Sequence, residues 1–218
     1  MGLLNNNIFG NSLYRLVPLL QFFSSRLKTQ LWYKRFLKEC GDKNVIIKPM
    51  LITPEFISLK NNVLIWYNAR IQGVPNYGAN QYHPNIILNN RVSIQQNVHI
   101  TCANRVEIGE DTAIAANVTI TDISHPYADI AIAPEYQLLE IGRVYIGPRC
   151  KIYNNVVILP DAILGRHCVV GANAVVRGGN YPDFSVIAGN PARIIRRYNI
   201  DTRQWQNTEP DGTFKKEK

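Results

Sequence analysis

One histidine of this chain stands where a general base would be useful. His125 lies in the segment Thr121-Asp122-Ile123-Ser124-His125-Pro126, where a regular sequence repeat stops and a long irregular segment begins. A histidine between a rigid face and a flexible loop can titrate near neutral pH and accept a proton from an attacking group. A solvated histidine at a loop start would give the same pattern, so position alone leaves both interpretations open.

Two carboxylates could orient this imidazole and stabilise its protonated form. Asp122 precedes His125 by three residues, and Glu107 precedes it by eighteen, which is one coil of the repeat described below. The sequence favours neither of them.

The other three histidines are weaker candidates for a catalytic or metal-binding role. His99 follows Asn97 and is outward by the repeat register, on a different face from His125, where it can serve an adjacent subunit or only the surface. His83 and His167 have no visible partner, and we expect them to be solvated. The nearest pair of histidines, His83 and His99, is sixteen residues apart, so we expect no metal site.

Arginines gather near the C-terminus. Gly189 and Pro191 mark a turn, and Arg193, Arg196 and Arg197 follow it. Planar guanidinium donors match the oxygens of a phosphate, so this cluster can bind one. A solvated helix end is the alternative.

A six-residue repeat must supply the elements that position these residues. An aliphatic residue occupies every sixth position from Ile146 through Ile152, Ile158, Leu164 and Val170 to Val176, with a small residue four places later. This period fits neither a helix nor an alternating strand and is typical of a stacked parallel β-helix. Three hexads make one coil, so Cys150 should lie beside Cys168, eighteen residues later and about 4.8 Å away.

Weaker hexads continue back to Ile47, and the chain gains two residues between Ile100 and Ile108. Two segments, Gln72 to Asn85 and Ile123 to Arg143, break the rhythm, and long loops on a regular scaffold are usually functional or disordered. We therefore expect an N-terminal helical cap over 1–44, a β-helix over 45–198 with 123–143 extruded, a short C-terminal helix, and a mobile polar tail over 199–218.

The composition fits one globular domain, with 218 residues of which 46% are hydrophobic and no run of ~18 apolar residues. Met1 to Asn11 lacks the basic start and apolar run of a signal peptide, so we expect a cytoplasmic location. Cys102, Cys150 and Cys168 fall at inward positions without a CxxC pair, which predicts buried reduced thiols. The net charge of +8 suits an anionic partner, but its dispersion and the absence of a recognition motif argue against nucleic acid.

Ser12 to Cys40 is predicted to be helical, with apolar residues at roughly helical spacing, and Pro18 is expected to bend or restart the helix. Lys28, Lys34, Arg35 and Lys38 give it a basic side. Such a helix can lie peripherally on the inner face of a membrane. It can also cover the open first coil of the solenoid, which is the favoured interpretation.

Taken together, the residues resemble the hexapeptide-repeat acyltransferases, which include galactoside, maltose and surface-polysaccharide O-acetyltransferases. The resemblance covers roughly 45–198. Its features are the hexads, the segment from Ile108-Gly109 through Ala115-Ala116-Asn117-Val118 to Ser124-His125-Pro126, and the ending Ala188-Gly189-Asn190-Pro191-Ala192-Arg193-Ile194-Ile195. It implies an all-β solenoid, a left-handed parallel β-helix, assembled as a homotrimer with acetyl-CoA between neighbouring prisms. Active sites would then be composite.

The resemblance also implies roles for single residues. His125 matches the family's base, which deprotonates the acceptor as it attacks the thioester carbonyl, without a covalent acyl-enzyme. The amide of Asn154 aligns with the family's oxyanion donor, although Tyr153 stands where a glycine is common. The residues expected to contact the cofactor are Gly171, Ala172, Arg177, Arg193 and Arg196. Those expected to contact the acceptor are Asn97, His99, Tyr127, Asp129, Glu135 and Tyr136.

The favoured function is that of an acetyl-CoA-dependent O-acetyltransferase in surface-polysaccharide biosynthesis (O-antigen or capsule), acting on a nucleotide-linked, lipid-linked or oligomeric sugar. An N-acetyltransferase of an amino-sugar nucleotide is the alternative within the same class. A non-catalytic β-helix that binds a ligand or serves as a scaffold is the alternative from another class, and His125 with the long loop after it argues against that alternative.

Overall fold

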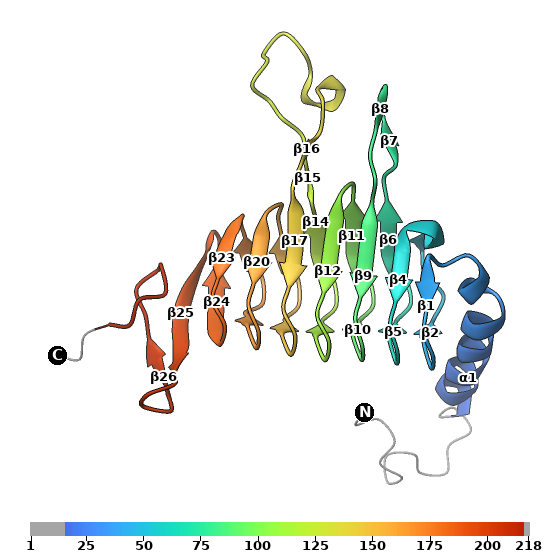
Figure 1. Cartoon of the computed structure of the whole chain (residues 1–218), viewed down its shortest axis with the longest axis horizontal. Coiled ribbons are helices and arrows are strands. Elements are labelled where there is room, and N and C mark those ends of the chain that lie inside the picture. The colour runs from blue at the N-terminus through green and yellow to red at the C-terminus, as the bar shows by residue number, and fades with distance from the viewer. Residues whose placement is uncertain (1–15, 216–218) are drawn as a thin grey trace.

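The computed structural model describes residues 16–215 as a left-handed parallel β-helix, a three-sided prism whose coils stack along one axis (Figure 1). Sheet A contains β1 (Glu39–Cys40), β4 (Ile57–Leu59), β9 (Asn85–Leu88), β12 (Arg105–Ile108), β17 (Arg143–Ile146), β20 (Ala162–Leu164) and β23 (Gly179–Tyr181). Sheet B contains β2 (Val45–Ile46), β5 (Leu64–Ile65), β10 (Ser93–Ile94), β13 (Ala113–Ile114), β18 (Lys151–Ile152), β21 (Val169–Val170), β24 (Ser185–Gly189), β25 (Ala192–Asn199) and β26 (Gln204–Asn207). Sheet C contains β3 (Leu51–Ile52), β6 (Arg70–Gly73), β11 (His99–Cys102), β14 (Thr119–Thr121), β19 (Val157–Ile158) and β22 (Val175–Val176).

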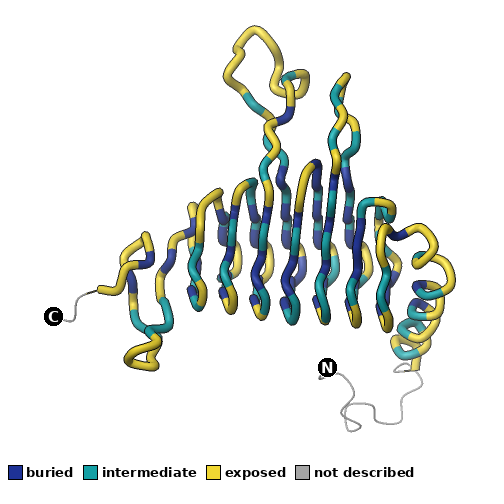
Figure 2. Tube along the Cα trace, viewed as in Figure 1, coloured by how far each residue is buried: buried dark blue, intermediate teal, exposed yellow. Residues whose placement is uncertain are grey.

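The hexads form this fold because each one supplies a short strand with one residue inward. All six leading aliphatic residues from Ile146 to Val176 are fully buried and belong to one continuous core. Figure 2 shows this core as the dark stripe repeated in every coil. The predicted stacking of Cys150 beside Cys168 is confirmed, since the next residues along, Lys151 and Val169, pair with each other. The four cysteines are free thiols.

The three corners of the prism, A–B, B–C and C–A, are named here by the sheets they connect in chain order. Corner B–C needs a left-handed backbone, and asparagine tolerates it better than most residues. Asn97, Asn117, Asn155 and Asn173 stack there with φ of 57°, 60°, 60° and 61°. Each side-chain amide donates to the next along the column, at 3.1, 3.1 and 3.0 Å.

Both predicted interruptions of the repeat leave the prism as antiparallel ribbons (Figure 1). The first carries the hairpin of β7 (Asn76–Tyr77) and β8 (Asn80–Gln81). The second carries β15 (Ile123–Ser124) and β16 (Glu140–Ile141), with the 3-10 turn η4 (Pro134–Tyr136) between them. We call residues 123–143 the extruded loop.

At the N-terminal end, α1 (Leu16–Leu31) covers the first coil, followed by η2 (Tyr33–Arg35), and η3 (Pro54–Phe56) lies beside β4. The helix is shorter than expected, because β1 already pairs with β4 in sheet A. Pro18 is the third described residue of α1, and the expected bend or restart at Pro18 stays a prediction, because the residues before Leu16 lie outside the described part. Residues Ser12 to Arg15 lie outside the described residues.

At the C-terminal end the expected short helix is wrong. Ala192–Asn199 forms β25, antiparallel to β24, and β26 pairs with β25 in turn, so part of the segment predicted as a tail is a strand. Ala192 and Ile194 face inward while Arg193 is exposed. This alternation is that of a half-buried strand, and the hairpin covers the last open edge of sheet B.

Candidate functional site

His125 lies at the base of the extruded loop, just after β15, and its side chain is exposed. The ring of Tyr77 stands edge-on against the imidazole, with centroids 5.4 Å apart and planes at 73°. The Tyr77 hydroxyl donates to the backbone carbonyl of Glu135 at 2.6 Å. The hairpin and the extruded loop therefore meet beside His125. Sequence reasoning missed Tyr77, whose only signal was an aromatic residue inside the first interruption.

Asp122 does not orient His125. Its carboxylate is fully buried beneath the loop and accepts hydrogen bonds from the backbone N–H groups of Ala103, Asn104 and Arg105, at 2.7, 2.9 and 2.8 Å. The Cys102 thiol also donates to it, at 3.2 Å. The two extra residues of this coil leave these backbone groups without sheet partners, and Asp122 satisfies them. Its role is structural.

Glu107 does not lie under His125 either. The coil that contains it is twenty residues long, because Thr101 pairs with Thr121, so an eighteen-residue step is wrong here. Glu107 instead sits in sheet A between Ile87 and Tyr145. Its carboxylate accepts hydrogen bonds from Arg105 at 2.7 Å and from Asn89 at 3.3 Å.

The side chains expected to contact an acceptor are displayed on the extruded loop. Tyr127 and Tyr136 are more than four-fifths exposed, and Asp129 is also exposed. The Gln137 side chain donates to the carbonyls of Asp129 and Ile132, at 2.9 and 2.7 Å. The loop is thus held by internal hydrogen bonds while its tyrosines remain available to a ligand.

Four of the expected cofactor and oxyanion residues lie on one ridge along corner B–C. Asn154, Gly171 and Ala172 occupy adjacent coils, since Tyr153 donates to Val170 and Asn173 donates to Asn154. Gly171 packs against Ala188, whose pairing partner is Arg193. The Asn154 N–H has no hydrogen-bond partner among residues 16–215, as an oxyanion donor requires.

The remaining cofactor residues lie apart from this ridge. Arg177 follows β22 at corner C–A, the corner that also carries His125. Arg196 is exposed on β25 and donates to the Trp205 carbonyl at 3.2 Å. Asn117 touches Asn155, and five residue steps lead from Asn117 through β14 to Asp122. At ~3.3 Å per residue, roughly 16 Å separates the ridge from corner C–A. One chain therefore does not bring His125 and Asn154 together.

Asn97 and His99 belong to sheet C and its corner. The Asn97 amide is committed to the asparagine column, so its expected contact with an acceptor competes with a structural hydrogen bond. His99 lies in β11 between Arg70 and Thr119. Burial, and then the charge of Arg70, lowers the pKa of His99 below its usual value of 6.5.

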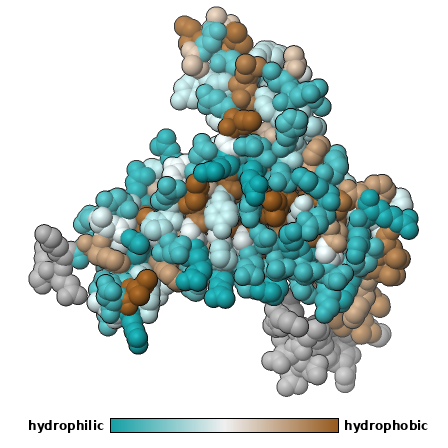
Figure 3. Space-filling view, viewed as in Figure 1, coloured by the Kyte–Doolittle hydropathy of each residue, from teal (hydrophilic) through white to brown (hydrophobic). Residues whose placement is uncertain are grey.

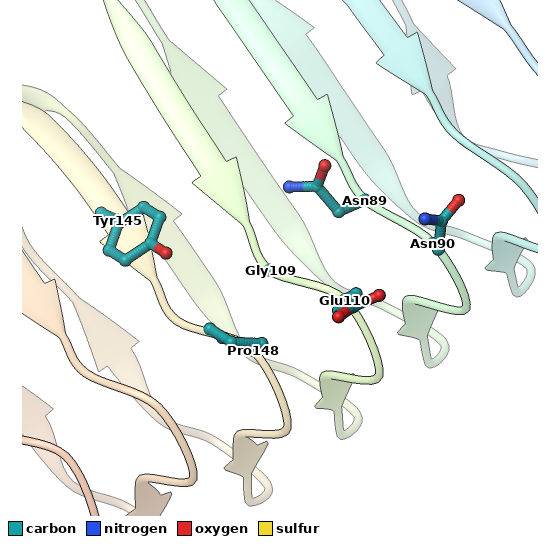
Figure 4. Close-up of a pocket in the computed structure, with 6 residues that line it drawn as sticks. All are labelled: Asn89, Asn90, Gly109, Glu110, Tyr145 and Pro148. Carbon is teal, nitrogen blue, oxygen red and sulfur yellow. The ribbon is translucent and has the colours of Figure 1, made fainter.

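A surface hollow lies on corner A–B, beside Glu107 and away from the corners that carry His125 and Asn154. Figure 4 shows its lining, which is Asn89, Asn90, Gly109, Glu110, Tyr145 and Pro148. Within residues 16–215 no group of three or more His, Cys, Asp or Glu side chains could hold a metal ion. No helix of this described part is long and apolar enough to span a membrane.

Comparison with known proteins agrees with this architecture. Residues 143–178 match the family model "Bacterial transferase hexapeptide (six repeats)". A putative lipopolysaccharide biosynthesis O-acetyl transferase, WbbJ of Escherichia coli K12, is 42% identical over 56% of this chain and 65% of its own length. The galactoside O-acetyltransferase of the same organism is 32% identical over 54% of this chain and 57% of its own. The chain thus spans less than two thirds of either relative.

Solved structures share the fold at low identity. AntD, an N-acyltransferase from Bacillus cereus in complex with dTDP and 3-hydroxybutyryl-CoA, superposes with a TM-score of 0.67 at 18% identity, over 82% of this chain and 92% of that one. VCA0836 of Vibrio cholerae, a hexapeptide-repeat acetyltransferase complexed with acetyl-CoA, gives 0.54 at 18% identity, over 88% and 92%. These comparisons show that the chain has the β-helix fold of hexapeptide-repeat acyltransferases and that residues 143–178 carry the repeat of that transferase family.

Proposed function

We propose that this protein transfers an acetyl group from acetyl-CoA to a hydroxyl of a sugar used in surface-polysaccharide synthesis, with His125 as general base. The observation that carries the proposal is the exposed imidazole at the base of a loop that displays Tyr127, Asp129 and Tyr136. A hydroxyl is a poor nucleophile at neutral pH, so a base beside it is useful. The resemblance to WbbJ and to galactoside O-acetyltransferase supports O-acetylation of a sugar.

The chemistry balances without a covalent enzyme intermediate. His125 takes the proton of the acceptor hydroxyl, the oxygen attacks the thioester carbonyl, and the unpaired N–H of Asn154 stabilises the resulting oxyanion. Collapse breaks the carbon–sulfur bond, and the proton passes from the imidazole to the leaving thiolate. The products are an O-acetyl sugar and free CoA thiol.

The separation of the two groups supports a composite site. His125 lies beyond corner C–A and Asn154 lies on corner B–C, roughly 16 Å away across sheet C. A second copy that sets its corner B–C against corner C–A of the first brings both groups to one acyl group. Threefold rotation repeats this contact and closes the assembly. Gly171, Ala172 and Arg193 of one chain and Arg177 of the next would then line the acetyl-CoA groove.

The test is release of free thiol from acetyl-CoA over a panel of nucleotide sugars, lipid-linked saccharides and oligosaccharides, comparing the wild type with His125→Ala. Loss of roughly a hundredfold or more on one acceptor is expected for a base catalyst. His167→Asn is the matched control, because His167 lies between β20 and β21 at corner A–B, away from corners B–C and C–A, and asparagine tolerates its φ of 57°. Acceptor-dependent release that does not respond to His125→Ala contradicts O-acetylation by this base and favours acylation of an amine. No release on any acceptor favours a non-catalytic binding role.

A further inference from the structure

The outer face of α1 is an apolar stripe made by Leu16, Leu20, Phe23, Leu27 and Leu31. These positions follow one another at intervals of four, three, four and four, which places them on one side of a helix. Each of the five side chains is between 49% and 67% exposed. Apolar side chains in contiguous array on a surface usually mark a site of interaction.

The stripe faces directly away from the β-helix. The buried side chains of α1 are polar ones, Ser25 and Thr29, with Phe22 half-buried beside them, and Thr29 Oγ1 accepts the N–H of Ile46 at 2.9 Å. At ~100° per residue, Ser25 and Thr29 lie on the opposite side of the helix from the stripe. Figure 2 shows α1 at the end of the prism, and Figure 3 shows apolar surface gathered there.

Two aromatic residues extend the stripe past the end of the helix. Trp32 and Phe36 are 54% and 49% exposed, and their ring centroids are 5.2 Å apart. Tryptophan, whose ring has a polar N–H edge, is common where an apolar phase meets water, and Phe36 adds apolar area beside it. The stripe and these two rings together form what we call the end patch.

Every charged side chain within residues 16–38 is basic, namely Arg26, Lys28, Lys34, Arg35 and Lys38, and the first acidic residue of the chain is Glu39. Lys34 pairs with Asp42 at 3.8 Å and Lys38 donates to Asn85, so Arg26, Lys28 and Arg35 are the cations that these contacts leave beside the end patch. Arg26 and Lys28 lie on the two sides of α1, each about 100° from the middle of the stripe. Long basic side chains in this position can keep their apolar stems beside the stripe and direct their charges outward.

We propose that the end patch docks the protein on an anionic phospholipid surface, with α1 lying in the plane of the interface. A 16-residue helix is about 24 Å long, and helices of this pattern bury their apolar face roughly 5–10 Å into the headgroup region. The basic side chains beside the end patch favour an anionic membrane over a second copy of this chain. A second copy docked through the same patch would bring these cations together, whereas anionic headgroups neutralise them.

Docking at the end of the prism leaves the extruded loop and all three side faces free. The following step, and no other, rests on the trimer proposed above. In that trimer a threefold axis parallel to the prisms places the three end patches in one plane. Three linked contacts bind far more tightly than one. The acceptor implied by such a location is a sugar carried on a membrane lipid.

The test is flotation of the whole protein with vesicles of phosphatidylglycerol and phosphatidylethanolamine, against vesicles of phosphatidylcholine alone. We expect flotation with the anionic vesicles, loss of it in about 1 M salt, where the Debye length falls to about 3 Å, and little with the neutral ones. Leu20→Gln/Phe23→Gln/Leu27→Gln should weaken binding at least ~tenfold. Arg26→Gln/Lys28→Gln should weaken it roughly tenfold or more on anionic vesicles only.

Ile195→Gln/Ile200→Gln is the matched control, since it removes exposed apolar surface from the opposite end of the prism and should float like the wild type. Unchanged thermal midpoints establish that the variants fold. Absence of flotation, or equal flotation of the triple variant, overturns the proposal. So does a fall in the molar mass of the triple variant by sedimentation without any vesicle binding, which would assign the patch to contact between copies. Flotation is independent of acetyl transfer, so the two proposals fail separately.

Discussion

The hydroxyl of Tyr77 binds the Glu135 carbonyl while the ring of the same residue stands edge-on against His125. One side chain therefore links the hairpin, the extruded loop and the proposed base. This contact limits how the exposed imidazole can turn, which matters because a base must be aimed at the proton that it removes.

Tyr77→Ala should lower kcat/KM by up to about tenfold, because an edge-on aromatic contact contributes roughly 0.5–1.5 kcal/mol. Tyr77→Phe keeps the ring and should lose less than Tyr77→Ala. Thiol-release kinetics on the preferred acceptor measure both. The variants should differ from wild type in kcat more than in thermal midpoint. Equal kinetics for all three proteins would remove any role for Tyr77 in positioning His125.

The buried hydrogen bonds of Asp122 predict that its removal lowers the free energy of unfolding. Asp122→Ala leaves three backbone N–H groups without a partner at a fully buried site, and bonds to a charged acceptor contribute about 1.5–3 kcal/mol each. We expect a loss of at least about 3 kcal/mol in the free energy of unfolding, measured by denaturant titration. Glu107→Ala is the comparison, because its carboxylate bonds only to side chains and its removal should cost much less. A stable Asp122→Ala protein with impaired catalysis would restore Asp122 as an orienting carboxylate.

Inward positions of the hexads could be predicted from the sequence, because burial of one aliphatic residue in six leaves a direct pattern. The neighbours of His125 could not be predicted from the sequence, because they depend on the number of residues in each coil. Two inserted residues shift Glu107 out of register and place the backbone N–H groups of residues 103–105 where the Asp122 carboxylate accepts them. The contact of Tyr77 with His125 joins two irregular segments that no period relates. The apolar residues of α1 have helical spacing, but that spacing does not reveal that Ser25 and Thr29 face the coil.

The asparagine column is only partly visible in the sequence, since two of its steps, 20 and 18 residues, are coil spacings while the third, 38 residues, spans the extruded loop. The resemblance assigns Asn97 to the acceptor instead. Asn97→Ala should lower the free energy of unfolding by about 1–2 kcal/mol. The variant loses the hydrogen bond to Asn117, and alanine tolerates the backbone φ of 57° less well than asparagine. Asn97→Gly keeps the backbone conformation accessible and should lose less. KM for the acceptor should stay unchanged in both. A raised KM with unchanged stability would return Asn97 to the acceptor site.

The lowered pKa of His99 predicts that the stability of the protein depends on pH. Burial and Arg70 lower its pKa in the folded state below 6.5, so the unfolded chain binds the proton more readily. Stability from this residue is therefore complete above the unfolded pKa and is lost as the pH falls from about 6.5 towards the folded pKa. Thermal midpoints measured between pH 7.5 and 5.5 should fall less in His99→Gln than in the wild type. An equal fall in both would contradict this assignment.

The four cysteines should differ in reactivity, because only Cys40 is partly exposed. Burial, followed by the charge of Asp122, raises the pKa of Cys102, and the adjacent Cys168 together with burial raises that of Cys150. Thiolate is the reactive form, so a buried thiol with a raised pKa reacts slowly. The hydrogen bond with Cys150 lowers the pKa of Cys168, but its side chain is fully buried and out of reach of a reagent. Titration of the native protein with a thiol reagent at neutral pH should therefore modify Cys40 rapidly and the rest only on unfolding. Cys40→Ser should abolish the fast phase, and a second rapid thiol in that variant would show that the coils open locally at Cys102 or at the stacked Cys150 and Cys168.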